Sequence, residues 1–269
     1  MSSEHNFIRN HVMEASAIVL DATKAYLIDT RLRAVLREHD IPDLTSLVRE
    51  LRRKPRGALS QAVVEALTTN ETSFFRDLTY YDALRETVIP SLIERRGSAR
   101  ELNVWSAACS TGQEPYSLAM MLADLPALED WKLRVHTTDI DRNVLERAKS
   151  GEYTQLEVNR GLPAANLLKH FEKTGKNWRV QGRAREMVTF AHLNLAKPWP
   201  HMPRMDLVLI RNVLIYFNME TKRDILRRAR RVMRPGGYLV LGGAETTINL
   251  TEAYERVRHG RAVMYKAAA

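Results

Sequence analysis

The sequence lacks several features that would point to an extracellular, membrane-spanning or metal-dependent protein. It has a single cysteine, Cys109, which excludes a disulfide framework and a cysteine-rich zinc site. No apolar run approaches the roughly 18 residues that a membrane-spanning helix needs. Residues 1–21 carry acidic side chains and no continuous apolar stretch, so they do not resemble a secretory signal. These absences favour a soluble protein in a reducing, cytoplasmic setting.

Motifs for two common ligand classes are also missing. The chain has neither the G-x-G-x-x-G pattern of dinucleotide sites nor a P-loop, which disfavours a pyrophosphate or triphosphate ligand. Aromatic residues make up only 7% of the chain, which counts against RNA, because RNA bases need stacking partners.

Positive charge is what the sequence has in excess. The 41 lysines and arginines outnumber the 32 acidic residues, which gives a net charge of +9. Such an excess indicates an acidic partner, and composition alone leaves nucleic acid, a membrane surface and a carboxylate-rich protein open.

Residues 1–70 show helical periodicity and no strand pattern. The stretch Ala17–Leu36 has apolar residues spaced by three and four, which predicts an amphipathic helix or helix pair. Asp43 and Ser60 are expected to cap two further helices. This part of the chain is predicted to be a small helical bundle.

From about residue 80, strand-like and helix-like segments alternate, which indicates a mostly parallel α/β sheet. The pattern predicts strands near residues 102–105, 133–138, 187–193, 205–210 and 238–243 and a hairpin around His259. A long arginine-bearing helix is expected to end at Pro235-Gly236-Gly237. This order is that of the class I methyltransferase sheet, although many doubly wound folds share most of it.

One segment is too long for the single helix that should connect two parallel strands. Residues 152–192 contain one helix-like piece, turn signals and short β-prone runs, which predicts a small inserted antiparallel β-subdomain. An exposed edge strand there could take an added strand from a partner peptide. The alternative is a structural cover over the sheet edge.

The turn after the first predicted strand, WSAACSTGQEPYS, consists largely of small residues, which allow a ligand close to the backbone. Glu114 in this turn would repel phosphate and attract a cation such as a sulfonium. Asp139 ends the second strand, where nucleoside-binding α/β folds place an acid for ribose hydroxyls. The combination suits S-adenosylmethionine. The alternatives are a tight packing turn and a helix cap, and Asp141 fits the cap better than Asp139.

Two more segments concentrate polar and aromatic residues. NETSFFRD, residues 70–77, joins the helical part to the sheet, and we expect this segment to fold over a cofactor, with its phenylalanines packing and Arg76 directed into the site. RNVLIYF, residues 211–217, follows a strand at the carboxyl edge where open sheets bind ligands. Cys109 is not expected to be a nucleophile, because no histidine is near it in sequence.

Taken in order, NETSFFRD, WSAACSTGQEPYSLAM, TTDIDRNVLERAKSGEY, HLNL and RNVLIYF resemble the chemotaxis receptor glutamate O-methyltransferases, the CheR family. The resemblance covers residues 10–265. It implies S-adenosylmethionine-dependent methylation of glutamate side chains on the cytoplasmic helices of chemoreceptors, with S-adenosylhomocysteine as product and no metal. The expected organisation is a helical domain (1–70), a linker over the cofactor site (71–80) and a methyltransferase domain (81–269) with the insert at 152–192.

The resemblance also implies which residues form the site. The implied cofactor contacts are Asn70, Thr72, Arg76, Glu114, Asp139, Asn194, Leu195, Arg211 and Asn212. Arg76 and Tyr216 match the positions proposed to act on the reacting groups. A glutamate carboxylate, with a reference pKa of about 4.3, is already ionised at neutral pH, so the reaction needs no general base.

The excess positive charge then has a specific candidate partner. Arg49, Arg52, Arg53 and Arg56 are predicted to share one helix face, which could dock on a glutamate-rich receptor helix bundle. The alternative is a solvated surface, which is the preferred interpretation for the arginines of residues 223–234. Neither nucleic acid nor membrane insertion is expected.

We expect the protein in the cytoplasm, recruited to membrane-bound receptor arrays. A receptor C-terminal peptide at the inserted subdomain and a regulatory protein at the site are further candidate partners. An RNA methyltransferase and a non-catalytic adaptor remain the competing functions.

Overall fold

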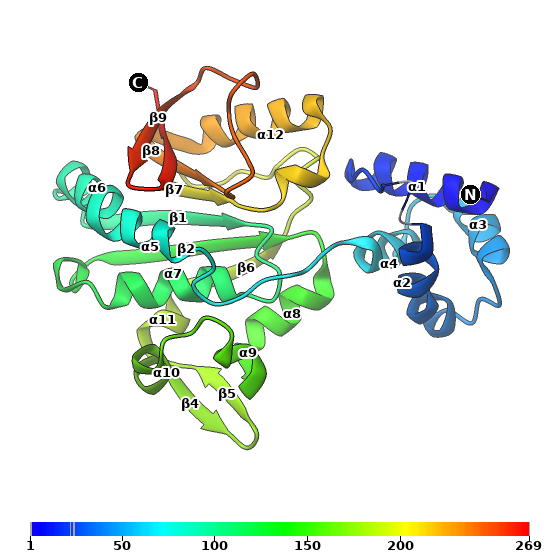
Figure 1. Ribbon diagram of the computed structural model, residues 1–269, viewed down its shortest axis with the longest axis horizontal. Coiled ribbons are helices and arrows are strands. Elements are labelled where there is room, and N and C mark those ends of the chain that lie inside the picture. The colour runs from blue at the N-terminus through cyan, green and yellow to red at the C-terminus, as the bar shows by residue number, and fades with distance from the viewer. Residues whose placement is uncertain (1, 22, 24, 269) are drawn as a thin grey trace.

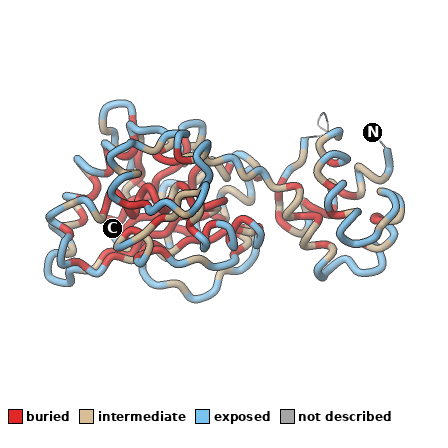
Figure 2. Tube along the Cα trace, turned by 90° about the horizontal axis from the view of Figure 1, so that it is seen from below, coloured by how far each residue is buried: buried red, intermediate tan, exposed pale blue. Residues whose placement is uncertain are grey.

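The computed structural model describes residues 2–21, 23 and 25–268. A helical unit lies beside a larger sheet unit, and an extended linker after α4 joins them (Figure 1). The helices of the first unit are α1 (Ser3–Ser16), α2 (Ala25–Glu38), α3 (Leu44–Arg53) and α4 (Ala58–Leu67). Buried residues occupy the centres of both units (Figure 2). Within the described part of the chain, no helix is long and apolar enough to cross a membrane.

The helix predicted across Ala17–Leu36 is wrong in its first part. Helix α1 ends at Ser16, and Ala17 turns the chain with a left-handed φ of 60°. Ile18 then forms an antiparallel bridge with Phe217 of the sheet unit. Ile18 is therefore buried by tertiary pairing and not by a helix face. Within this stretch, Ala22 and Lys24 lie outside the described residues.

Of the two predicted helix caps in the helical unit, one is confirmed. Asp43 caps α3 by accepting a hydrogen bond from the backbone N–H of Ser46. Ser60 is not a cap, because α4 begins two residues earlier, after Gly57. The Ser60 hydroxyl is instead buried inside the bundle, at 2.8 Å from His11 Nε2.

The main sheet confirms the predicted class I methyltransferase order. Its seven strands run in the order β6-β2-β1-β7-β8-β10-β9, of which the first five are parallel and the last two form the predicted antiparallel hairpin. The bounds are β1 (Glu101–Ala107), β2 (Lys132–Asp139), β6 (Val188–His192), β7 (Met205–Ile210), β8 (Met233–Leu241), β9 (Tyr254–His259) and β10 (Ala262–Ala267).

Helical segments flank this sheet, three of them before β1 and the others on the connections between its strands (Figure 1). They are α5 (Leu78–Ala83), the π-helical turn η2 (Leu84–Val88), α6 (Ile89–Arg96), α7 (Gln113–Ala123), the 3₁₀ turn η3 (Pro126–Leu128), α8 (Arg142–Ser150), the 3₁₀ turn η4 (Leu214–Tyr216) and α12 (Met219–Val232). Helix α12 ends earlier than the predicted Pro235-Gly236-Gly237. Those residues belong to β8, because Met233 already pairs with Met205 of β7.

The insert contains the predicted antiparallel sheet, with strand order β3-β5-β4. Its elements are β3 (Glu152–Thr154), α9 (Gln155–Asn159), α10 (Ala164–His170), β4 (Phe171–Thr174), β5 (Asn177–Val180) and α11 (Gly182–Glu186). Strand β6, which falls inside the predicted 152–192, pairs in parallel with β2 of the main sheet. The antiparallel unit therefore ends before residue 188.

The helical unit contacts the sheet unit at the carboxyl edge of the sheet. The backbone N–H of Val19 donates to the carbonyl of Tyr216 at 2.8 Å. The side-chain amide of Asn194 donates to the carbonyl of Ala15 at 2.9 Å. These contacts bring the helical unit against the loops that follow the parallel strands.

Candidate active site

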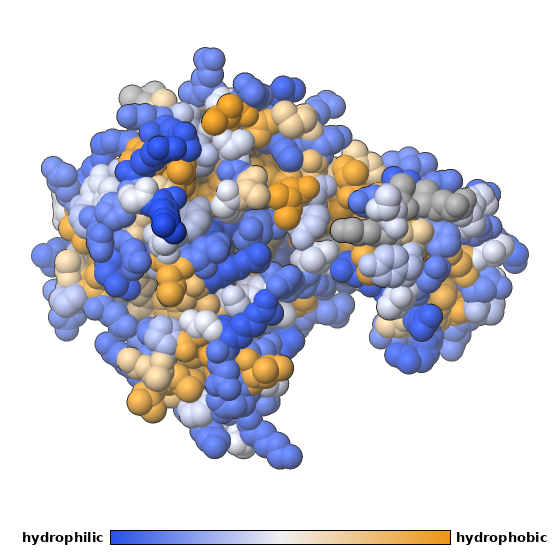
Figure 3. Space-filling view, viewed as in Figure 1, coloured by the Kyte–Doolittle hydropathy of each residue, from blue (hydrophilic) through white to orange (hydrophobic). Residues whose placement is uncertain are grey.

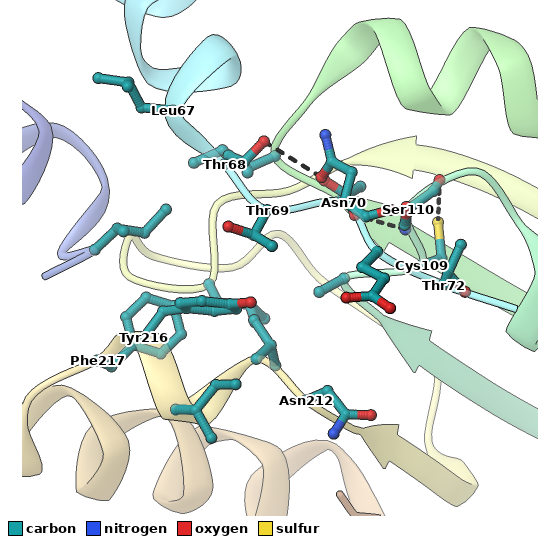
Figure 4. A pocket seen from close by; sticks show the side chains of 18 of the residues that line it. Leu67, Thr68, Thr69, Asn70, Thr72, Cys109, Ser110, Asn212, Tyr216 and Phe217 are labelled. Carbon is teal, nitrogen blue, oxygen red and sulfur yellow. Dashed lines mark hydrogen bonds between the residues drawn. The ribbon is translucent and has the colours of Figure 1, made fainter. Parts of the chain in front are cut away.

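A cavity of about 380 Å³ lies between the helical unit, the linker and the carboxyl ends of β1, β2 and β7. Ala107 at the end of β1 pairs with Thr138 of β2 and with Ile210 of β7, so the loops that follow the three strands meet there. Every site residue implied by the resemblance lines this cavity: Asn70, Thr72, Arg76, Glu114, Asp139, Asn194, Leu195, Arg211, Asn212 and Tyr216. Figure 4 shows Asn70, Thr72 and Ser110 on one side, with Asn212 and Tyr216 on another.

Asp139 lies buried at the base of this cavity. One carboxylate oxygen accepts the backbone N–H of Ser110 at 2.8 Å, and the other accepts that of Asp141 at 2.9 Å. Burial raises the pKa of Asp139 to about 6, although the two backbone donors oppose the rise. Each carboxylate oxygen can accept a second hydrogen bond, so Asp139 can still bind a ligand hydroxyl.

Asp141 and Asn70 fix the neighbouring backbone. Asp141 caps α8, as predicted, by accepting from the N–H groups of Asn143 and Val144. It also accepts from the side-chain amide of Asn70 at 2.8 Å. The carbonyl of Asn70 accepts the Ser110 hydroxyl at 2.8 Å. Asn70 therefore ties the linker to the loops after β1 and β2.

Glu114 and Arg211 form a buried ion pair beside the cavity. Arg211 Nη1 lies 2.9 Å from Glu114 Oε2, and Arg211 Nη2 lies 2.7 Å from Asp77 Oδ2. The Arg211 side chain is only 2% exposed, and its guanidinium lies 4.4 Å from the centroid of the Tyr80 ring. Burial alone would lower the pKa of Arg211, but Glu114, Tyr81, Tyr80 and Asp77 together outweigh it and the pKa is raised. Both terminal nitrogens of the guanidinium are therefore paired with protein carboxylates. A ligand that contacts Arg211 would have to lie next to Glu114 and Asp77.

The linker segment 71–77 is held over the cavity by tertiary contacts. Arg211 Nη2 donates to the carbonyl of Arg76 at 3.1 Å, and the N–H of Phe75 donates to the Ser117 hydroxyl at 2.9 Å. Phe75 and Asp77 adopt left-handed φ values of 46° and 65°, a strained backbone that these contacts must maintain. Arg76, which lies between these two residues, lines the cavity.

The two phenylalanines of this segment pack, as expected, and their partners belong to the protein core. Neither of them lines the cavity. Phe74 packs edge to face against Tyr153 and Phe171 of the insert, with ring centroids 4.9 and 5.7 Å apart. Phe75 packs against Tyr81 at 5.0 Å. Both rings anchor the linker to the core, and this is how they serve the site.

Cys109 lines the cavity, but its environment disfavours a role as nucleophile. Its side chain is buried, and burial raises the pKa of the thiol well above its ordinary value. The reactive thiolate is therefore disfavoured, in agreement with the sequence-based expectation.

Comparison with known proteins identifies the family. The model of the CheR methyltransferase all-alpha domain matches residues 3–68, and that of the CheR methyltransferase SAM binding domain matches residues 70–263. The chain belongs to the CheR methyltransferase family. Its two matched domains meet at residues 68–70, where α4 gives way to the linker.

Individual relatives agree with this assignment. The chain is 38% identical to Chemotaxis protein methyltransferase 1 of Pseudomonas aeruginosa, over 99% of this chain and 98% of that protein. It is 37% identical to Chemotaxis protein methyltransferase Cher2 of Pseudomonas putida, over 94% of each. Among solved structures, an N-methyltransferase of Bradyrhizobium japonicum in complex with S-adenosyl-L-homocysteine matches with a TM-score of 0.39 and 17% identity, over 69% of this chain and 87% of that one.

The side chains around this CheR cavity fit S-adenosylmethionine. Asp139 is a buried acceptor at the end of β2, and Glu114 adds a second carboxylate to the wall. Ala108 and Ser110 adopt left-handed φ values of 54° and 52°, so the loop after β1 turns tightly between them. A cavity of this volume is within the range of small-molecule sites.

Of the four arginines predicted to share one helix face in the helical domain, three lie on the same helix. Arg49, Arg52 and Arg53 lie on α3 and are exposed. Arg56 does not share their helix face, because α3 ends at Arg53. Arg53 is paired with Glu50 at 2.6 Å.

The arginines of residues 223–234, predicted to form a solvated surface, make several contacts within the protein. Arg228 lies 4.6 Å from the Trp199 ring centroid and donates to the carbonyl of Leu195 at 2.6 Å. Arg234 Nε lies 3.3 Å from the buried Asp206 carboxylate. At least two of these arginines therefore stabilise the sheet unit.

Two site residues are missing from the sequence-based prediction. Asp77 pairs with Arg211. Glu245, in the loop after β8, accepts the backbone N–H groups of Asn212, Val213 and Ile215. Asp77 belongs to the NETSFFRD segment, so the sequence motif already pointed to this stretch of the chain. Glu245 lies outside the five motif segments, and only the tertiary structure reveals its contacts.

Proposed function

We propose that this CheR protein transfers the methyl group of S-adenosylmethionine to glutamate side chains of chemoreceptors and forms glutamate methyl esters. The observation that carries the proposal is the convergence of five separate motif segments on one cavity at the carboxyl edge of the sheet. The relatives named chemotaxis protein methyltransferases support the chemoreceptor as substrate.

The cofactor side of the cavity is the wall beside β1 and β2. We assign Asp139 to the ribose hydroxyls, because it is a buried carboxylate with free lone pairs. Glu114 contributes negative charge for a cationic ligand, although Arg211 balances part of it. The remaining proposed contacts are Asn70, Thr72, Arg76, Asn194, Leu195, Arg211 and Asn212.

The acceptor side is assigned to Arg76 and Tyr216. When bound, S-adenosylmethionine supplies an electrophilic methyl group on a positively charged sulfur. The acceptor glutamate oxygen forms the new bond to the methyl carbon while the carbon–sulfur bond breaks, and no proton is transferred. Arg76 and Tyr216 orient the carboxylate, so catalysis rests on proximity and alignment. A single hydrogen bond to one oxygen is preferable to a tight ion pair, which would stabilise the ground state.

The rim of the cavity suits a protein acceptor. Val19 and Ile215 both line the cavity and are 49% and 48% exposed. Figure 3 shows apolar side chains gathered over the segments around α12 and toward the helical unit. An apolar rim fits the side chains around a glutamate on a helix better than it fits a phosphate backbone.

Two further surfaces are proposed to bring the receptor close. The exposed arginines of α3, together with Arg56, would attract a glutamate-rich helix bundle. In the insert, β4 pairs with β5 alone among the described strands, so its other edge can take a strand from a receptor C-terminal peptide. A protein that methylates receptor cytoplasmic regions would act in the cytoplasm at receptor arrays, where a regulatory protein could also reach the site.

A transfer assay tests the proposal. Chemoreceptor membranes are incubated with the protein and S-adenosylmethionine labelled in its methyl group. We expect protein-bound label that is released by base, as a carboxyl ester requires. Cofactor binding without transfer to receptors would favour an adaptor, and base-stable label on RNA would favour an RNA methyltransferase. Either result contradicts the proposal.

Tyr216→Phe is expected to lower kcat about tenfold, the worth of one hydrogen bond to a charged group. The affinity for S-adenosylhomocysteine should stay within about threefold, because the substitution removes only a hydroxyl on the acceptor side. Tyr26→Phe is the matched control, since Tyr26 is exposed and does not line the cavity. Unchanged turnover in Tyr216→Phe would refute the role of the hydroxyl.

Reversing two charges on α3, with Arg49→Glu and Arg52→Glu together, is expected to lower kcat/KM for receptors about three- to tenfold at low salt. The loss should shrink as salt rises, because screening weakens attraction between exposed charges. Arg256→Glu with Arg258→Glu on β9 makes the same change in charge at another exposed site. An equal loss in both double variants would assign the effect to net charge and not to a docking surface.

A further inference from the structure

The β7 loop, residues 211–217, forms a cavity wall without regular secondary structure in its first part. Asn212 adopts a left-handed φ of 57°, and the single 3₁₀ turn η4 begins only at Leu214. Asn212, Val213 and Tyr216 all line the cavity. Backbone of this kind needs partners for its N–H groups, because no helix or strand supplies them.

Glu245 supplies these partners from the loop that follows β8. Its Oε2 accepts the backbone N–H groups of Asn212 at 2.8 Å and Gly242 at 2.7 Å. Its Oε1 accepts those of Val213 at 2.9 Å and Ile215 at 3.3 Å. Four backbone donors therefore converge on one carboxylate, which is a pure acceptor in its ionised form.

The loops after β7 and β8 are in close contact at this point. A Cβ atom added to Gly242 would lie 2.6 Å from Asn212 Nδ2 and 2.8 Å from the Asn212 backbone nitrogen. Only glycine fits there. The Glu245 carboxylate thus holds a loop whose backbone has little room to shift toward β8.

The far end of the β7 loop is held by the helical unit. The Tyr216 carbonyl accepts the N–H of Val19, and Phe217 forms a bridge with Ile18. The loop is therefore fixed by Glu245 near its start and by the segment after α1 at its end. Tyr216 lies next to this second attachment, in the turn that Glu245 supports.

We infer that Glu245 is a positioning residue for methyl transfer, which sets the conformation of the β7 loop and through it the place of Tyr216. Glu245 does not line the cavity, so it would act through the loop that it holds. The inference rests on the proposed function, because it takes Tyr216 as the residue that orients the acceptor. It predicts a larger effect on the acceptor side, because Asp139 and Glu114 share no hydrogen bond with Glu245. Of the proposed cofactor contacts, Asn212 is the one that Glu245 holds, through its backbone N–H.

The test variant is Glu245→Gln, which keeps the shape of the side chain but replaces one acceptor oxygen with an NH₂ donor that faces backbone donors. We expect kcat for receptor methylation to fall at least about tenfold, with the Kd for S-adenosylhomocysteine within about threefold of wild type. Glu252→Gln is the control, because Glu252 is exposed in the same connection between β8 and β9. An equal loss of cofactor affinity and turnover would indicate a general structural role and overturn the inference.

A double-mutant cycle with Tyr216→Phe separates positioning from independent effects. If Glu245 acts through Tyr216, the loss from Glu245→Gln should be much smaller when the Tyr216 hydroxyl is already absent. Fully additive losses would overturn the inference. If Glu245→Gln does not fold, Glu245→Asp serves in the same cycle, because it keeps the charge but draws the carboxylate back by one methylene. Wild-type activity in that variant would equally overturn it.

Amide hydrogen exchange provides a readout that does not depend on the acceptor. The amides of Asn212, Val213 and Ile215 should be protected in the wild type and exchange at least about tenfold faster in Glu245→Gln. Unchanged protection would overturn the inference even if the protein methylates receptors. If the transfer assay fails but Glu245→Gln still speeds exchange, Glu245 holds the loop and the proposed function is wrong. The two failures can therefore be told apart.

Discussion

Arg211→Met is expected to lower the free energy of unfolding by about 3–5 kcal/mol and to abolish methyl transfer. The substitution leaves the largely buried Glu114 carboxylate without its cation and Asp77 without its partner. A figure near the lower end is expected, because Asp77 is 47% exposed and water can solvate it. Urea unfolding measures the stability, and the transfer assay measures the activity.

The loss of activity has a separate physical cause. Arg211 also donates to the carbonyl of Arg76, so its removal frees a linker whose left-handed residues are strained. Arg211→Lys is the matched control: it keeps the positive charge but cannot make the two-pronged contact, and we expect an intermediate loss. A methionine variant with wild-type stability and turnover would show that the ion pair has no role in holding the linker.

Asp139→Asn is expected to weaken binding of S-adenosylhomocysteine about 10- to 100-fold, the range for hydrogen bonds to a charged acceptor. Both carboxylate oxygens accept backbone N–H groups, so an amide in either orientation places its NH₂ against a donor. Asp130→Asn is the control, because Asp130 is 82% exposed and precedes β2, at the end of the strand away from the cavity. Isothermal titration of both variants gives the comparison.

The same carboxylate predicts a pH dependence. The pKa of Asp139 in the folded protein, about 6, lies above its ordinary value, so ionisation costs stability as pH rises through about 6 and that cost disappears at low pH. Cofactor affinity should follow the opposite trend, because the ionised form accepts hydroxyls. We expect Kd to rise about tenfold between about pH 7 and pH 5. A Kd that rises equally in Asp139→Asn would assign the titration to another group.

Local sequence signals succeeded where a side chain acts on its own segment. Asp43 and Asp141 cap the helices that follow them, and the alternation after residue 80 became the predicted parallel strands and hairpin. The same signals failed where a distant segment decides the outcome. Ser60 resembles a cap but bonds to His11 of another helix, and Ile18 resembles a helical residue but pairs with Phe217.

The motif segments predicted which residues line the candidate site, but they did not predict how those side chains are arranged. All ten implied residues line one cavity, because the carboxyl ends of β1, β2 and β7 lie side by side. The phenylalanines of NETSFFRD were expected to pack, but only the structure shows against what: Phe74 contacts Tyr153 and Phe171 of the insert. Aromatic residues in a linker can pack on either side, and sequence does not say which.

From sequence alone, the low cysteine content and the lack of glycine-rich nucleotide motifs and long apolar runs excluded several classes of protein. The five motif segments then indicated the family and the chemistry to look for. The order of the strands and the positions of the motif residues followed from local patterns. Only the tertiary structure decided which charges remain available. Arg211 forms ion pairs with Glu114 and Asp77. Glu245 accepts hydrogen bonds from a loop that lies some thirty residues before it in the chain. The reason is physical: hydrogen bonds and ion pairs depend on distances of about 3 Å between segments far apart in sequence.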